Sequence, residues 1–230
     1  MIITINGPAA SGKSTISRML ADQLEYYYLC SGLLYRAIAY ILVNTYGYTP
    51  ETLTTITVED IMHCVDPTRL RYDYDELCQE RIFFDNDDIT PYLKDKFVDH
   101  ITSIISVNKH VRSAVMFIQH TLAAHHSVVA DGRDVGSVVF PQADVKFFVT
   151  ASVAVRAERW RKDQERYNNH LSFDEAIALI TDRDDRDKNR VIAPLIIPDN
   201  AIVIDTSELS AQETVEKMMS YINDRLSREL

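Results

Sequence analysis

The string Gly7-Pro-Ala-Ala-Ser-Gly-Lys-Ser14 is the feature that most constrains what this chain can fold into. It matches the Walker A pattern G-x-x-x-x-G-K-[ST]. A β-branched run over residues 2–6 precedes it, and apolar residues at helical spacing follow it at Ile16, Leu20 and Leu24. In such a strand–loop–helix unit the loop N–H groups and the positive helix end face bound phosphate. We therefore expect a phosphate-binding loop that opens a parallel α/β sheet, with an ordinary strand-to-helix turn as the alternative.

Within this loop, each residue type has a distinct chemical role. Lys13 would reach the β- and γ-phosphates of ATP, and the Ser14 hydroxyl would bind Mg²⁺. The expected ATP-binding residues are Gly7, Pro8, Ala9, Ala10, Ser11, Gly12, Lys13, Ser14 and Thr15.

The rest of the chain continues an α/β pattern. Further buried strands are expected at residues 26–30, 127–131, 145–149 and 201–205. Helical periodicity marks residues 34–41, 97–124 and about 210–226, whereas residues 66–88 alternate charged, aromatic and aliphatic side chains. The predicted fold class is a P-loop-type parallel sheet flanked by helices, with a small antiparallel insertion and a helical lid.

The charge balance limits the partners that the chain could bind. It has 24 Lys and Arg against 34 Asp and Glu, a formal net charge of −10, which argues against a nucleic-acid groove. Its apolar runs are shorter than the ~18 residues of a membrane span, and Met1–Asn6 is too short for a signal peptide. Cys30, Cys64 and Cys78 lack metal-ligand spacing. We expect a cytoplasmic protein with reduced thiols and with no membrane or nucleic-acid partner.

A second charged string, Asp131-Gly-Arg-Asp134, follows the apolar residues 128–130. This strand end resembles a Walker B segment, in which Asp131 would face Mg²⁺ directly or through water. The alternative is a simple turn, because Asp favours turns. Arg133 can clamp a phosphate with two hydrogen bonds, and the Asp134 carboxylate can accept hydrogen bonds from the exocyclic amine of a base.

A third charged cluster lies at residues 182–190. If it is helical, Arg183, Asp187 and Arg190 occupy positions i, i+4 and i+7 and share one face. Four acidic and four basic residues also fit a solvated helix with exposed salt bridges. The polar stretch 161–169 precedes the cluster, so the arginines fit a lid that stabilises charge during phosphoryl transfer.

Together the motifs resemble the bacterial-type cytidylate kinase family of nucleoside-monophosphate kinases, over residues 2 to about 222. The strings that carry the resemblance are Gly7–Thr15, Ser31-Gly-Leu-Leu-Tyr-Arg36, Asp131-Gly-Arg-Asp-Val-Gly136, Val139-Phe-Pro141 and Arg183-Asp-Asp-Arg-Asp-Lys-Asn-Arg190 with Ala193-Pro194. The resemblance implies transfer of a phosphoryl group from ATP, with Mg²⁺, to CMP and dCMP. It also implies a monomer with a single domain over residues 1–230. That domain would comprise a core (1–60 and 107–230), a monophosphate-binding insertion (about 61–106) and a lid (about 156–170).

The resemblance assigns roles position by position. The implied acceptor-phosphate ligands are Ser31, Arg36, Arg133 and Arg190. The implied readers of the cytosine ring are Ser103, Arg112 and Asp134, and Arg183 and Asp187 would lie near the sugar. The implied catalytic set is Lys13, Asp131, Arg183 and Arg190. Ser31 as a helix N-cap, and Ser103 and Arg112 as helix-surface residues, are the structural alternatives.

Two departures from the family pattern stand out. Cys30 occupies a position where members usually carry Asp, and residues 91–96 replace a segment that typically contains an Ile-Arg pair. Lys94 can supply a charge there, but it cannot reproduce the planar, two-pronged contact of Arg.

Three other functions remain to be weighed. A P-loop kinase for UMP, shikimate or gluconate shares the first motif, although the Asp131–Asp134 string and the insertion disfavour the last two. A GTP-binding switch protein needs an Asn-Lys-x-Asp motif, and Asn108-Lys-His-Val111 lacks its Asp. A nucleic-acid-dependent ATPase conflicts with the net charge.

Overall fold

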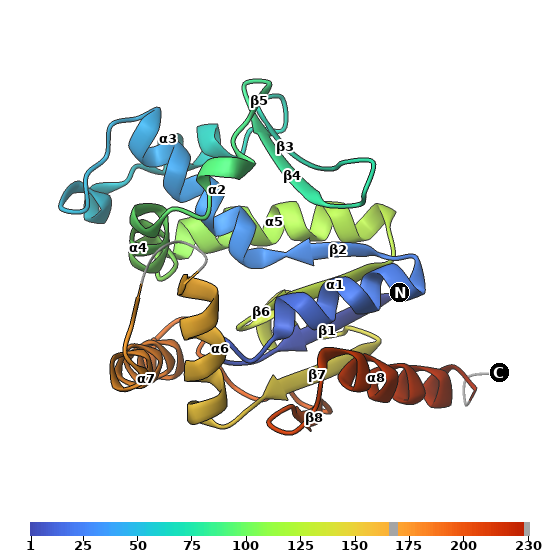
Figure 1. Cartoon of the computed structure of the whole chain (residues 1–230). Helices are drawn as coiled ribbons and strands as arrows, with labels where there is room; N and C mark the ends of the chain where they lie inside the picture. Colours follow the sequence, from blue (N-terminus) through green and yellow to red (C-terminus); the bar gives the residue numbers. More distant parts are fainter. Residues whose placement is uncertain (166–169, 228–230) are drawn as a thin grey trace. The chain divides into compact units, whose positions relative to one another are not determined.

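The computed structural model describes residues 1–165 and 170–227, and it divides the chain into two compact units. The first unit comprises Met1–Tyr28 and Ser127–Leu230, and the second comprises Leu29–His126. Figure 1 traces both along the sequence. Each unit has its own sheet and core, so each is described by itself.

A parallel sheet organises the first unit (Figure 1). Its central strand, β1 (Ile2–Asn6), pairs on one side with β6 (Val128–Gly132) and on the other with β7 (Val145–Thr150). The strands β2 (Tyr27–Cys30) and β8 (Ile202–Asp205) complete the order β2-β6-β1-β7-β8. Asn6 is in register with Gly132 and Phe148, so these strands end at the same edge of the sheet. The five predicted core strands are therefore confirmed.

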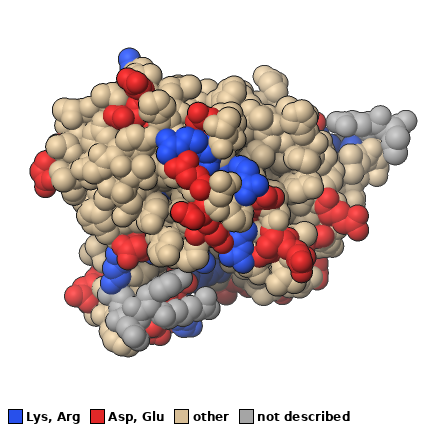
Figure 2. Space-filling view, turned by 90° about the horizontal axis from the view of Figure 1, so that it is seen from above, with Lys and Arg blue, Asp and Glu red and all other residues tan. Residues whose placement is uncertain are grey.

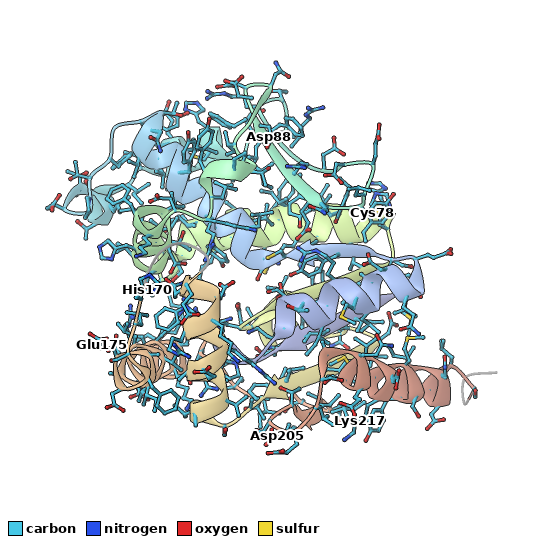
Figure 3. The ribbon with its side chains drawn as sticks, viewed as in Figure 1. Cys78, Asp88, His170, Glu175, Asp205 and Lys217 are labelled. Carbon is cyan, nitrogen blue, oxygen red and sulfur yellow. The ribbon has the colours of Figure 1, made fainter. Side chains whose placement is uncertain are left out.

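Within the described residues of this unit, four α-helices pack around the sheet and against one another. α1 (Lys13–Leu24) packs against β6 and α8 (Ala211–Leu226), and α6 (Val153–Glu165) packs against α7 (Phe173–Asn189). Capping boxes fix where α7 and α8 begin, with Ser172 and Ser210 as the N-caps; Glu175, which completes the first box, is labelled in Figure 3. A π-helical turn, residues Val135–Val139, follows β6.

The second unit is a helical cluster with a small antiparallel sheet. Its helices are α2 (Ser31–Asn44), α3 (Val58–Cys64), α4 (Lys96–Ile105) and α5 (Lys109–His125), with 3₁₀ turns at Thr52–Thr55 and Thr90–Tyr92. Its strands are β3 (Leu70–Tyr74), β4 (Glu80–Phe84) and β5 (Asp87–Asp88). α2 packs against α3, α4 and α5 around one apolar core. The antiparallel insertion is thus confirmed.

The helical run expected over residues 97–124 is two helices. The break lies between α4 and α5, where the Asn108 side chain accepts hydrogen bonds from the backbone N–H groups of His110 and Val111. Asparagine is a strong N-cap, so it starts a new helix although the apolar spacing continues across the break. The short α3 was not anticipated, because only Ile61 and Cys64 of its residues are buried.

The surface visible in Figure 2 mixes charges of both signs. On the face shown in Figure 2, basic atoms stand beside acidic ones, and the described residues there form no continuous basic strip. Among residues 1–165 and 170–227, no helix combines the length and the apolar character that crossing a membrane requires. The three cysteines all lie in the described part of the chain, and none is in a disulfide.

Candidate active site

The phosphate-binding loop connects β1 to α1 as the sequence predicts. A Cβ on Gly7 would lie 2.0 Å from the carbonyl oxygen of Val149 in β7, so only glycine fits this close approach. Gly12 is the N-cap of α1 and has a left-handed backbone with φ 89°, which a side chain would strain. The nearby β7 backbone therefore requires glycine at position 7, and the left-handed conformation at the start of α1 requires it at position 12.

Lys13 is buried at the first position of α1. Its Nζ donates a hydrogen bond to the carbonyl oxygen of Pro8 at 2.7 Å, and only 6% of the residue is exposed. Burial, and secondarily the positive charge of Arg133, lower the pKa of Lys13 well below its ordinary value, against the attraction of Asp131. An anionic ligand stabilises the charged form of a lysine that is desolvated in this way, because the charge of the ligand replaces the lost hydration.

The two side chains expected to bind magnesium lie in contact. The Ser14 hydroxyl donates to Oδ2 of Asp131 at 2.8 Å. Ser14 is exposed, whereas Asp131 is 3% exposed and is the last residue but one of β6, the strand next to β1. A hydroxyl and a carboxylate are the oxygen donors that suit Mg²⁺, which usually takes one or two protein ligands and completes its shell with phosphate and water. The described residues hold no cluster of three or more His, Cys, Asp and Glu side chains that could bind a metal ion.

A network of charges lies beyond the end of β6. Arg133 Nε donates to Oδ2 of Asp187 at 2.7 Å. Arg190 lies 3.8 Å from Asp134 and 3.9 Å from Asp187. Burial alone would raise the pKa of Asp187, but Arg133 and Arg190 hold it below its usual range. Two implied phosphate ligands, Arg133 and Arg190, are therefore gathered in one ion-pair network with the implied base reader Asp134 and the implied sugar residue Asp187.

Asn6 holds the loop that carries this network. Its Nδ2 donates to the carbonyl oxygen of Arg133 at 3.0 Å, and its Oδ1 accepts from the N–H of Gly136 at 2.8 Å. The sequence interpretation missed Asn6. It is the last residue of β1, and polar residues at the carboxyl ends of neighbouring parallel strands meet at one edge, so its position was a usable signal.

The charged cluster at residues 182–190 has a buried face and an exposed face. Arg183, Asp184, Asp187 and Arg190 point inward to different degrees, whereas Asp182, Asp185 and Arg186 are exposed. The helix ends at Asn189. Arg190 would be part of it if the whole cluster were helical, but it is instead the C-cap and has an extended backbone. It reaches the network from there, and its Nε donates to the carbonyl oxygen of Ala193 at 2.7 Å.

Two arginines of α6 contact the phosphate loop, and the sequence interpretation assigned neither. Arg156 donates from Nη1 to the carbonyl oxygen of Ala9 at 3.1 Å and forms an ion pair with Asp184 at 2.6 Å. Arg159 donates to the carbonyl oxygen of Ser11 at 3.4 Å and to that of Thr206 at 2.7 Å. No local motif announces these contacts, because they depend on how α6 packs.

The remaining implied CMP ligands belong to the second unit. Arg36 of α2 pairs with Asp99 of α4 at 2.6 Å, and Ser103 lies on the same helix one turn after Asp99. Arg112 of α5 is 8% exposed and donates to the carbonyl oxygen of Ser106, the C-cap of α4. Arg36, Ser103 and Arg112 therefore gather around α4. Asp99, the partner of Arg36, was missed by the sequence interpretation.

The surroundings of Ser31, Arg112 and Ser103 test the structural alternatives to their roles in binding CMP. Ser31 is the first residue of α2 and is 7% exposed, and the N-cap is Cys30, whose side chain makes no capping hydrogen bond. An N-cap role for Ser31 is therefore excluded. Arg112 is buried, which excludes the helix-surface reading for it, while Ser103 is exposed. Lys94 is exposed in the segment between the second 3₁₀ turn and α4.

The segment expected to be a lid, about residues 156–170, falls on the end of one helix and the connection that follows. Residues 156–165 belong to α6, and residues 166–169 lie outside the described part of the chain.

Comparison with known proteins agrees with this set of features. The model of the family described as "Cytidylate kinase" matches residues 3–224. The cytidylate kinase of Thermodesulfovibrio yellowstonii is 34% identical over 221 residues, 96% of this chain and 97% of that protein. The cytidylate kinase of Geobacter sulfurreducens is 34% identical over 225 residues, 98% of this chain and 94% of that protein. The solved structure of TT1252 from Thermus thermophilus aligns with a TM-score of 0.49 at 15% identity, over 98% of this chain and 97% of that one. On the family model and these two relatives, the chain belongs to the cytidylate kinase family.

Proposed function

We propose that the protein transfers the γ-phosphoryl group of ATP to CMP and dCMP, forming CDP and dCDP. The observation that carries this proposal is the joint presence, in the first unit, of a phosphate loop with a buried Lys13 and of the Arg133–Asp187–Arg190 network. One feature suits a nucleoside triphosphate donor, and the other supplies half-buried arginines for an anionic acceptor.

On the donor side, residues Gly7–Thr15 would hold the ATP phosphates. The backbone N–H groups of the loop and the N-terminus of α1 supply partial positive charge. Lys13 supplies a full charge, and its hydrogen bond to Pro8 is the contact that phosphate oxygens would replace.

Ser14 and Asp131 fit magnesium and would hold it, Asp131 directly or through water. When bound with ATP, Mg²⁺ neutralises charge on the β- and γ-phosphate oxygens. The protein's own part is to keep a hydroxyl and a carboxylate at one place, at the mouth of the loop.

On the acceptor side, we assign Ser31, Arg36, Arg133 and Arg190 to the CMP phosphate. We assign Ser103, Arg112 and Asp134 to the cytosine ring, and Arg183 and Asp187 to the sugar. Asp134 suits the 4-amino group of cytosine because a carboxylate accepts and never donates when it is ionised. Uracil presents a carbonyl oxygen there, which would leave two acceptors facing each other.

The reaction needs little proton chemistry. The acceptor phosphate is already an anion, so its oxygen attacks the γ-phosphorus while the bond to the β–γ bridging oxygen breaks and ADP leaves. Arg183 and Arg190 would stabilise the charge on the transferred group. The seven histidines have no assigned part in this scheme.

We also propose that the chain acts as one catalytic domain with the three functional parts that the family pattern implies. Residues 1–60 and 107–230 would form the core, about 61–106 the monophosphate-binding insertion, and about 156–170 the lid.

The test is product formation over a panel of acceptors. ATP, Mg²⁺ and the protein are incubated with CMP, dCMP, UMP, AMP and GMP in turn, and ADP release is followed while the new diphosphate is identified by chromatography. We expect CDP and dCDP to form fastest, with UMP intermediate. Failure to phosphorylate any monophosphate would refute the proposal, and AMP as the best acceptor would refute its base assignment.

A further inference from the structure

A buried ion pair joins α6 to α7 next to the phosphate loop. Arg156 and Asp184 are each 4% exposed, and Nη1 of Arg156 lies 2.6 Å from Oδ2 of Asp184. Burying two charges is costly unless their remaining hydrogen-bonding positions are also satisfied, so such a pair is a weak device for stability alone. Where Arg156 directs its other N–H groups therefore indicates what the pair is for.

The other N–H groups of Arg156 bind backbone at two points. Nη1 donates to the carbonyl oxygen of Ala9 at 3.1 Å, and Nε donates to that of Ala151 at 3.0 Å. Ala9 lies within the phosphate loop, whereas Ala151 directly follows β7. One guanidinium thus joins the loop, the end of a core strand and, through Asp184, helix α7.

This contact fixes the direction of a loop amide. In a trans peptide the C=O and the N–H point in opposite directions. Because the carbonyl of Ala9 points to Arg156, the N–H of Ala10 points away from α6. The methyl group of Ala10 also packs against the small apolar cluster of Ala157, Ala176 and Ile180. Arg156 and this cluster therefore set the loop in one orientation.

Asp184 connects that orientation to the acceptor side. It lies on α7 next to Arg183 and one turn before Asp187, which Arg133 holds at 2.7 Å. The helix is thus fixed at two points, by Arg156 through Asp184 and by Arg133 through Asp187. Oδ1 of Asp184 has no hydrogen-bond partner within the described residues, so the carboxylate depends on Arg156.

We propose that Arg156 and Asp184 are a positioning pair that couples the phosphate loop to α7, so that ATP phosphates in the loop strengthen the binding of CMP. The proposal rests on the proposed function, because it takes the loop as the donor site and α7 as a carrier of acceptor ligands. The first nucleotide to bind orders the loop, the pair and α7 together, and the second nucleotide binds to a helix already in place. By linkage, CMP strengthens ATP binding by the same factor.

The coupling factor is measured by calorimetry. CMP is titrated into the intact protein with and without a saturating non-hydrolysable ATP analogue and Mg²⁺, and the ratio of the two dissociation constants is the coupling. We expect a ratio of about 5–150 for the natural sequence, the usual range of coupling between sites.

Two variants and one matched control isolate the pair. Asp184→Asn removes the buried charge, whereas Arg156→Lys keeps the charge but loses the planar contact with both carbonyl oxygens. In both, the ratio should fall to within about twofold of one, while CMP binding without the analogue stays near its natural value. Asp182→Asn makes the same substitution two residues from Asp184, at an exposed pair with Arg186 (3.0 Å), and should keep the full coupling. Thermal unfolding shows which variants are folded. If Asp184→Asn does not fold, the coupling ratio of Arg156→Lys tests the proposal.

Full coupling in a folded Arg156→Lys or Asp184→Asn protein would overturn the proposal. So would an equal loss in Asp182→Asn, or a ratio of one in the natural sequence. None of these results touches CDP formation, so the proposed function would stand if the coupling fails. Absence of CDP formation would instead remove the proposed function.

Discussion

Replacing Lys13 by methionine separates catalysis from folding. The Lys13 ammonium group is buried and donates to the carbonyl oxygen of Pro8 at 2.7 Å. Methionine has nearly the same length but offers neither charge nor donor. If Lys13 contacts the transferring phosphate, its loss removes a preorganised charge, and such losses cost on the order of 10²–10³ or more in rate, about 2.7–4 kcal/mol. We therefore expect kcat/KM to fall on the order of 10²–10³-fold or more.

The expected effect of this substitution on stability is small because two contributions oppose each other. Leaving the Pro8 carbonyl without its donor costs about 1–3 kcal/mol. Replacing a buried charge by an apolar side chain of similar volume is often neutral or stabilising by about 1–4 kcal/mol. The net change should lie within about 1 kcal/mol, which corresponds to a shift of about 2–4 °C in Tm for a chain of this size.

The pKa of Lys13 adds a pH signature. Burial, with Arg133, lowers that pKa below its ordinary value, so over the interval up to about pH 10.4 the unfolded state binds more protons than the folded state. The free energy of unfolding should therefore rise with pH across this interval, relative to Lys13→Met. Over the same interval kcat/KM for ATP should fall, because the charged form of Lys13 is lost. Opposite trends in stability and activity are the expected result.

Lys146 supplies a matched control for both measurements. Its Nζ also donates to a proline carbonyl oxygen, that of Pro141 at 2.5 Å, but the residue lies on β7 outside the proposed site. Lys146→Met should keep turnover within about twofold. Turnover is followed by ADP release, and stability by thermal unfolding without nucleotide. A folded Lys13→Met protein with near-normal turnover would remove the donor-site assignment, and so would an equal loss in Lys146→Met.

Three further predictions concern the charge network. Asp134→Ala should weaken CMP binding about 10–100-fold, the value of one lost hydrogen bond to a charged group, while ATP affinity measured by calorimetry changes little; equal weakening of both would count against a base-reading carboxylate. Arg190→Ala should lower kcat on the order of 10³-fold, whereas Arg186→Ala, on the exposed face of α7, should stay within about twofold in the same ADP-release assay; similar losses would place the activity loss in the helix and not in Arg190. Burial would raise the pKa of Asp187, but Arg133 and Arg190 hold it low, so the ionised carboxylate stabilises the fold at neutral pH and this contribution is lost as the pH falls below about 3.9. Asp187→Asn should therefore lower the free energy of unfolding at pH 7 and make it depend less on pH in the acid range. An unchanged acid dependence would contradict this.

Local patterns were enough to predict the sheet and the loop. A buried parallel strand is a short β-branched run, and the runs at residues 2–6, 127–131, 145–149 and 201–205 all lie in core strands. The Walker A glycines could be recognised from their spacing alone, although the close approach that requires glycine at position 7 comes from Val149 on β7. The break between α4 and α5 was harder, since apolar spacing continues through Asn108 and only its capping side chain marks the boundary.

Much of the candidate site depends on packing that the sequence does not display. The contact between Ser14 and Asp131 could be expected from the topology, because β1, which leads into the phosphate loop, and β6, which carries Asp131, are neighbours that end at the same edge of the sheet. The pairing of Arg156 with Asp184 does not, because it requires the relative rotation of two helices. Arg36 with Asp99 is of the same kind: both side chains are charged and lie 63 positions apart, and nothing local indicates that they meet.

The order in which β1 acquires its neighbours has a consequence for synthesis of the chain. β1 is translated before both strands that pair with it, which come after residue 127, and the whole second unit is made in between. The N–H of Tyr27 donates to the carbonyl oxygen of Ser127 at 3.0 Å, so the chain leaves and re-enters the first unit at one point. On the ribosome the second unit can fold from contiguous chain while the backbone of β1 is still unpaired. An unpaired apolar strand of this kind favours aggregation. Slow or faulty folding of residues 29–126 would therefore harm yield by prolonging the exposure of β1, even where it leaves the finished enzyme's chemistry unchanged.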